Sequence, residues 1–330
     1  MRIAHLADYR GLEGNVLENF IDKIPSVIDK TLGNNSEADA VKESGGILVN
    51  PAAAKYVNDI GQKLVKNSDI RSDFGYKFGL VRDERPNAFA LPNGSIYVTL
   101  GLLRTLNDES QLANVLGHEV AHVTKRHTMK QIGVNAGSSI GTAALFGLVS
   151  AIGSGVLTKE QKQQGKELVN GLLENGYSRE NESESDQVGQ GLATKSGWSP
   201  KGMIEVMKGF QALDKVKPKG VEAYMRSHPY AGDRVKAAEG RLPSLTQEYP
   251  KSQDTGEERY KAFLVDVEKT APPPAAKPGE AGSLTFGPQG LQSRPAFKLD
   301  WDVKTIAGIV LIGGSALVLL YLLFKGKKGE

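Results

Sequence analysis

Residues 109–127 of the chain read ESQLANVLGHEVAHVTKRH. Apolar residues recur in this stretch at steps of three and four, which predicts a helix with one buried face, and Asn107 or Asp108 can cap its start. His118 and His122 are four positions apart and therefore project from the same side of that helix. The stretch predicts a helix that carries two histidines toward one point.

The pattern from His118 to His122 is HExxH, which on a helix is typical of zinc hydrolases. The spacing lets two imidazole nitrogens bind one zinc ion, and Glu119 can receive a proton from the attacking water. His127 lies five residues after His122, about 140° further round a continuous helix. We therefore expect His127 to stay outside the site, as a solvated residue near the helix C-terminus.

The composition restricts the chemistry of such a site. The 330 residues include 41 Lys and Arg, 38 Asp and Glu, five His and no Cys. A formal net charge of +3 argues against a polybasic arm, and we expect no nucleic-acid partner. Without cysteine there is no thiolate ligand, so the third protein ligand of a hydrolytic zinc site is to be sought among carboxylates.

The best source of a carboxylate ligand is residues 177–189, which read YSRENESESDQVG. Glu182 and Asp186 are four positions apart, and so are Glu180 and Glu184. Both pairs can share one side of a helix. The spacing alone does not choose between them.

Four segments, in this order along the chain, resemble the M48-type zinc metallopeptidases, the family that includes the membrane protease HtpX, Oma1-like mitochondrial proteases and bacterial envelope relatives. The segments are NAFALPNGSIYVTLGLL (87–103), LGHEVAHV (116–123), YSRENESESDQVG (177–189) and SHPYAGDRV (227–235). The resemblance covers about residues 41–250. It implies a zincin-type metallopeptidase domain that binds one Zn²⁺ per chain and hydrolyses polypeptides.

The resemblance also implies which carboxylates serve the metal. The family's third ligand maps onto Glu182, and its second carboxylate maps onto Asp186, which would accept the ring proton of His118 and fix its orientation. Arg179 fits the SR element of the same segment and is expected to pair with local carboxylates, behind the metal ligands.

Two residues of the last segment resemble the family's HPxxxxR element near the metal. His228 is expected either to stabilise the oxyanion or to occupy the open zinc position in a resting state. These two roles stay open. Arg234 is expected to tie its helix to the core.

Short strands accompany the helices. Alternating residues around 76–81 and the runs NAFAL (87–91) and SIYVT (95–99) are strand-like, and Pro92-Asn93-Gly94 predicts a turn between the last two. The fold class is therefore α+β, dominated by helices, with a small β-sheet. The strand at residues 87–90 is expected to be an edge on which an extended substrate adds. The candidate substrate-binding residues are Asn87, Ala88, Phe89 and Ala90.

The chain is expected to contain five parts. These are an N-terminal amphipathic helical segment (1–40), the peptidase domain (41–250), a proline-rich stalk (251–304), a transmembrane helix (305–324) and a basic tail (325–330). Residues 305–324 carry no charge and would span roughly 30 Å as a helix, about one hydrocarbon thickness. We therefore predict a single-pass membrane protein with the lipid bilayer as a partner.

Sidedness rests on the charges beside this helix. Lysines in the tail favour a cytoplasmic tail and a catalytic domain on the extracytoplasmic, periplasmic side. No export signal is visible in residues 1–24, so a cytoplasm-facing tail anchor is the alternative.

A second uncharged stretch, residues 132–158, separates the HExxH histidines from Glu182, and all three must meet at one ion. It is therefore expected to be a buried or lid-like helical excursion.

These observations predict a membrane-anchored zinc metalloendopeptidase in which Glu119 is the general base. Its expected substrates are misfolded or membrane and envelope proteins, as in protein quality control. The alternative is a zinc-bearing, membrane-associated chaperone or scaffold with latent protease activity. The resemblance disfavours a third reading, a metal hydrolase that acts on something other than peptides.

Overall fold

The computed structural model describes residues 21, 24–68, 74–135, 147–152, 155, 157–216, 228, 233–270, 284–287 and 290–293. All of them belong to one compact unit, and the second unit (276–282 and 294–330) lies outside the described residues. The predicted amphipathic segment up to residue 20, the transmembrane helix at 305–324 and the tail at 325–330 also lie outside them. Among the described residues, no helix combines the length and the apolar character that a membrane crossing requires.

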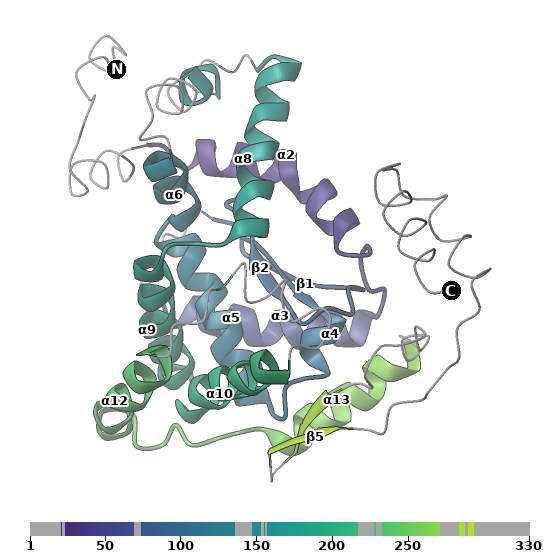
Figure 1. The fold of residues 1–330 in the computed structure, drawn as a ribbon, viewed down its shortest axis with the longest axis vertical. Helices are drawn as coiled ribbons and strands as arrows, with labels where there is room; N and C mark the ends of the chain where they lie inside the picture. The colour runs from purple at the N-terminus through teal and green to yellow at the C-terminus, as the bar shows by residue number, and fades with distance from the viewer. Residues whose placement is uncertain are drawn as a thin grey trace, which may run out of the picture. The chain divides into compact units, whose positions relative to one another are not determined.

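A three-stranded sheet forms the centre of the fold (Figure 1). Its strands are β1 (Lys77–Val81), β2 (Ala88–Ala90) and β3 (Ser95–Thr99), in the order β1-β3-β2. β3 runs parallel to β1 and antiparallel to β2. Gly94 adopts a φ of 92° in the turn between β2 and β3, a conformation that suits glycine. The predicted strands and the predicted turn are confirmed.

Helices cover both faces of this sheet (Figure 1). They are α2 (Val27–Glu43), α3 (Pro51–Lys66), α4 (Leu100–Leu103), α5 (Glu109–Thr124), α6 (His127–Asn135), α8 (Lys159–Asn175), α9 (Arg179–Lys195), α10 (Lys201–Val216), α12 (Asp233–Glu248) and α13 (Glu257–Thr270). Ala88 and Ala90 point into the larger apolar core with α3, α5 and α10, whereas Phe89 points into a second core with α2 and α8. The helix-dominated α+β class is confirmed.

The contact between α5 and α9 depends on two glycines. A Cβ added to Gly117 would lie 2.7 Å from the Gly189 carbonyl oxygen, and a Cβ added to Gly189 would lie 2.5 Å from the His118 nitrogen. Both separations are too short for real side chains. The glycine pair therefore lets the two backbones touch beside His118.

The folded body extends further than expected. The predicted stalk begins at residue 251, but α13 buries Tyr260, Phe263 and Val267 in the larger core. These residues recur at three- and four-residue steps, the pattern of an amphipathic helix. The Tyr260 hydroxyl donates to the Leu103 carbonyl at 2.8 Å. The boundary of the stalk at residue 251 is therefore wrong, because the chain is packed as far as Thr270.

Within the remainder of the predicted stalk, β4 (Leu284–Gly287) and β5 (Gly290–Ser293) pair as an antiparallel hairpin.

The excursion predicted at 132–158 is described only in part. Leu148 and Ile152 lie in the second core, so this part of it is buried as expected.

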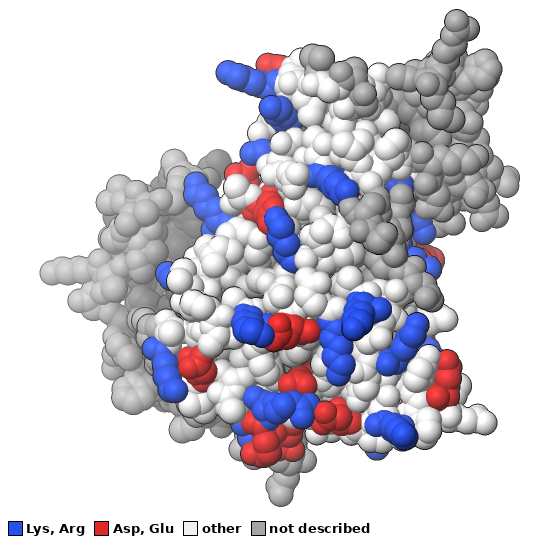
Figure 2. Space-filling model, turned by 180° about the vertical axis from the view of Figure 1, so that it is seen from behind, with Lys and Arg blue, Asp and Glu red and all other residues white. Residues whose placement is uncertain are grey.

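Charged side chains of both signs are intermixed on the face opposite to that of Figure 1, as Figure 2 shows for its described part. This distribution agrees with the nearly balanced composition, 41 basic against 38 acidic residues.

Candidate metal centre

Helix α5 places both HExxH histidines inside the protein. Asp108 caps the helix by accepting a hydrogen bond from the Gln111 backbone at 2.9 Å, which decides between the two candidate caps. The prediction of one buried face is wrong, because the sheet, α9 and α10 surround α5 and bury every residue from 109 to 123. His118 and His122 thus face each other away from water, with 3.0 Å between their Nε2 atoms.

Helix α9 brings Glu182 to the same point. Its Oε2 lies 3.5 Å from His118 Nε2, and its Oε1 lies 3.3 Å from His122 Nε2. Glu180 is exposed, and Glu184 turns toward Lys125 instead. Packing of α9 on α5 therefore selects Glu182, which the spacing could not do.

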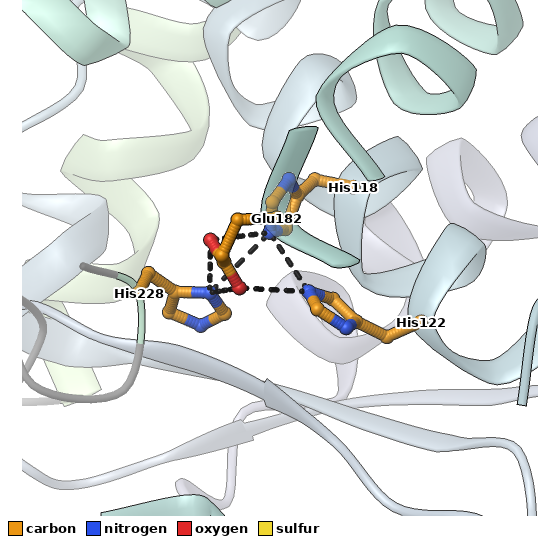
Figure 3. A group of neighbouring side chains, drawn as sticks. All are labelled: His118, His122, Glu182 and His228. Atoms are coloured by element: carbon orange, nitrogen blue, oxygen red, sulfur yellow. Dashed lines mark hydrogen bonds and ion pairs between the residues drawn. The ribbon is translucent and has the colours of Figure 1, made fainter. Parts of the chain in front are cut away.

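His228 completes a group of four donors (Figure 3). Its Nδ1 lies 3.3 Å from His118 Nε2 and 3.2 Å from Glu182 Oε1. One donor atom from each of His118, His122, Glu182 and His228 lies within 4.8 Å of the others, and all four residues are buried.

This donor set fits a zinc ion. Zinc takes imidazole nitrogen and carboxylate oxygen in tetrahedral sites at about 2.0–2.2 Å, which puts neighbouring ligand atoms roughly 3.3 Å apart. The separations between the donor atoms of His118, His122 and Glu182 are of this size.

Asp186 and Arg234 lie behind the donors. Asp186 accepts from His118 Nδ1 at 2.9 Å and from Arg234 Nε at 2.6 Å. Arg234 Nη1 lies 3.0 Å from Glu182 Oε2. Burial alone would raise the pKa of Asp186, but hydrogen bonds from His118 and Arg234 hold it below its ordinary value. Asp186 is placed as expected, and Arg234 ties its helix to both carboxylates.

Glu119 stands beside the four donors. It is buried, with 2% of its surface exposed, and burial raises the pKa of its carboxyl group above the ordinary value. His228 Nε2 lies 3.5 Å from Glu119 Oε1. A buried carboxylate with a raised pKa, next to a metal site, can accept a proton near neutral pH.

The charges of this group act on one another. Burial alone would raise the pKa of Glu182, yet His228 and His118 hold it well below the ordinary value. Burial alone would lower the pKa of His228, but Glu182 and Glu119 raise it to about 9. A cation among these donors would replace the proton on His228, because metal and proton compete for the same lone pairs.

The sequence profile of peptidase family M48 matches residues 51–242, which include α5, α9 and His228. The chain belongs to peptidase family M48. Its metalloprotease character follows from this membership, and the site described above lies within the matched segment.

Three relatives show how far this M48 similarity extends. The beta-barrel assembly-enhancing protease of Yersinia pestis is 29% identical over 212 residues, 62% of this chain and 42% of the relative. The mitochondrial metalloendopeptidase OMA1 of Schizosaccharomyces pombe is 28% identical over 188 residues, 57% of this chain and 52% of the relative. The metalloprotease YcaL of Escherichia coli is 27% identical over 219 residues, 64% of this chain and 82% of the relative. The chain thus spans less than half of the first of these proteins.

Two expectations about this M48 site fail. Arg179 acts on a local carboxylate, Glu180, as expected, but it is exposed in the first turn of α9 and does not lie behind the metal donors. His127 is fully buried beside His122 rather than solvated. The helical offset from His122 does not apply, since α5 ends at Thr124 and a new helix begins at His127.

The break between these helices is held by Arg126. It adopts a φ of 56°, which is uncommon for a bulky residue, and its buried guanidinium binds Asp29 and the Ile24 carbonyl.

The sequence did not predict a role for Tyr177, whose ring stacks on His122 at 4.1 Å between centroids. The only signal for His127 was the cluster of three histidines within ten residues.

Proposed function

We propose that this M48 peptidase is a zinc-dependent endopeptidase that holds one zinc ion per chain at His118, His122 and Glu182. The observation that carries the proposal is the convergence of these three buried donors beside Glu119, on two helices that touch through glycines. Held by these residues, zinc would supply a Lewis acid for the scissile carbonyl and for the attacking water. Glu119 accepts the proton of the attacking water and passes it to the leaving amine.

The β2 strand supports a polypeptide as the substrate. The two ends of this stretch are bonded to β3. The Asn87 carbonyl accepts from the Thr99 backbone N–H at 3.0 Å, and the Leu91 backbone N–H donates to the Ser95 carbonyl at 2.8 Å. Bonded residues alternate in an antiparallel pair, so Ala88 and Ala90 turn their peptide groups to the free edge. An extended chain can pair there through its backbone, which gives loose sequence preference.

A cavity of about 470 Å³ lies on one side of β2. Asn87 and Phe89 line it, together with residues of α2 and α8. Side chains alternate across a strand, so every second side chain of a paired substrate would enter this cavity. The cavity therefore suits an endopeptidase that binds several residues of its substrate.

His228 occupies the space between this edge and the donors in a resting state. Its Nε2 lies 3.3 Å from the Ala88 carbonyl oxygen, while its Nδ1 faces Glu182. A substrate peptide paired with β2 would need the same space, so His228 must leave before hydrolysis.

His228→Ala is expected to raise kcat/KM on a short unstructured peptide several-fold and to weaken zinc binding at least about tenfold, because it removes both the obstruction and a fourth donor. Peptide kinetics and zinc titration of the same preparation measure the two effects. If kcat instead falls by about a hundredfold or more with unchanged zinc affinity, His228 is an oxyanion donor and the resting-state role is wrong.

Metal removal tests the proposed function directly. The full chain, treated with a chelator and dialysed, is expected to lose cleavage of casein and to regain it on addition of one equivalent of zinc. The loss follows from the absent Lewis acid, and gel assays with metal analysis measure it. Persistent binding of unfolded casein without any cleavage in the zinc-loaded protein would favour the chaperone alternative.

We further propose that residues 305–324 anchor the protein in a membrane, with the catalytic domain on the extracytoplasmic side. Its substrates would then be misfolded membrane or envelope proteins. The uncharged stretch and the lysines that follow it support this arrangement. Protease accessibility of the domain in sealed membranes would distinguish it from a cytoplasm-facing tail anchor.

A further inference from the structure

A second layer of polar contacts lies behind His122, on the side away from the metal donors. His127 Nδ1 lies 3.0 Å from His122 Nδ1, and His127 Nε2 lies 3.0 Å from Glu184 Oε2. Lys125 holds the other oxygen of Glu184 at 2.9 Å. His127 is completely buried, whereas the Glu184 side chain is 37% exposed. The contacts form an unbroken row from the metal donors to the protein surface.

The carboxylate at the outer end decides which nitrogen of His127 carries the proton. Glu184 also binds the Lys125 ammonium group at 2.9 Å and reaches solvent, and a carboxylate in this setting accepts hydrogen bonds rather than donating them. His127 Nε2 must therefore be the donor. His127 Nδ1 then faces two groups that can donate to it, His122 Nδ1 at 3.0 Å and the Ser185 hydroxyl at 3.1 Å, and it acts as an acceptor.

The state of His127 in turn decides the state of His122. A bare Nδ1 at 3.0 Å from His122 Nδ1 requires the latter to carry its proton. Neutral imidazole has one proton, so His122 Nε2 is then unprotonated and faces Glu182. The Ser185 hydroxyl lies 3.1 Å from His127 Nδ1 and can donate to the same lone pair. The opposite tautomer of His127 would set a bare Nε2 against a carboxylate, which is repulsive.

We propose that His127 and Glu184 are positioning residues of the metal site: His127 accepts the Nδ1 proton of His122 and thereby keeps His122 Nε2 unprotonated toward the metal. This inference rests on the proposed zinc site and deepens it. Each α5 histidine thus has its own carboxylate. Asp186 orients His118 directly, and Glu184 orients His122 through one intervening imidazole.

The test compares two replacements of His127 in the full chain. His127→Asn keeps an amide oxygen close to the position of Nδ1, whereas His127→Leu fills similar space without an acceptor. Zinc affinity, measured by competition with a chromogenic chelator, is expected to fall 10- to 100-fold in the leucine variant and to stay within about threefold of wild type in the asparagine variant. Nitrogen NMR of labelled histidine should show a protonated Nδ1 on His122 in wild type and in the asparagine variant.

A second pair of variants serves if His127→Leu does not fold. Glu184→Leu removes the outer carboxylate and is expected to weaken zinc binding about three- to tenfold, whereas Glu180→Leu, at an exposed position on the same helix, leaves it unchanged. Equal losses in the leucine and asparagine variants of His127, or no loss in either, would overturn the inference. Failure of the wild-type chain to bind one zinc ion would instead contradict the proposed function.

Discussion

Replacing Glu119 by glutamine is expected to lower the rate of peptide hydrolysis about a thousandfold while zinc stays bound. General bases contribute roughly 10² to 10⁴ to such reactions, and an amide cannot accept the proton of the attacking water. Glu119 lies beside the four donors without belonging to them, so zinc affinity should change little. Single-substrate kinetics and metal analysis of the same preparation measure both quantities.

The position of Glu119 makes this substitution a specific probe. Its carboxyl group is buried and close to His228, and glutamine has nearly the same volume, so the packing should be kept. Glu180→Gln, at an exposed position, is the matched control and is expected to hydrolyse at the wild-type rate. Cleavage by the Glu119 variant at the wild-type rate would show that another group is the base.

Glu182→Gln is expected to weaken zinc binding by a factor on the order of a hundred or more and to abolish activity in step. Zinc binding to structural sites is worth about 10–16 kcal/mol over four ligands, so one ligand corresponds to roughly 3 kcal/mol. The change also removes the charge that faces Arg234 at 3.0 Å. Zinc titration by calorimetry measures the loss.

The same helix again provides the comparison. Glu180→Gln changes the same chemistry two residues earlier, but outside the site, and should bind zinc as wild type does. If the two variants lose zinc equally, Glu182 is not a ligand. If only Glu182→Gln unfolds without metal, circular dichroism with and without zinc separates the stability effect from ligation.

The sequence predicted those parts of the fold that depend on local periodicity. Helix α5 and the three strands follow from residue spacing and turn chemistry, whereas the choice of Asp108 over Asn107 as the cap needed the structure. The selection of Glu182 over Glu180 does not, because both sit in pairs four residues apart. It is decided where α9 crosses α5 at Gly117 and Gly189, a contact between residues far apart in the chain.

His127 was misplaced for a related reason. Extrapolating one helix past Thr124 assumes that the helix continues, yet the chain turns at Arg126. That turn is held by Asp29, which lies 97 residues earlier in the sequence. Helix periodicity carries no information about such a partner. The predicted stalk boundary at residue 251 is wrong for a different reason, because Tyr260, Phe263 and Val267 have the spacing of an amphipathic helix and the proline-rich composition begins only after that helix.

Arg234 contacts two buried carboxylates, Glu182 and Asp186, and so affects the balance of charge around the site. Glu119, Glu182 and Asp186 are buried together, and besides Arg234 the protonated ring of His228, with its pKa raised to about 9, offsets their negative charge. Uncompensated charge in a protein interior is costly. A bound metal ion takes over this role when it displaces the proton of His228. Metal loading and resistance to unfolding should therefore rise together, and a protein that has lost its metal would be recognisable by its lower melting temperature.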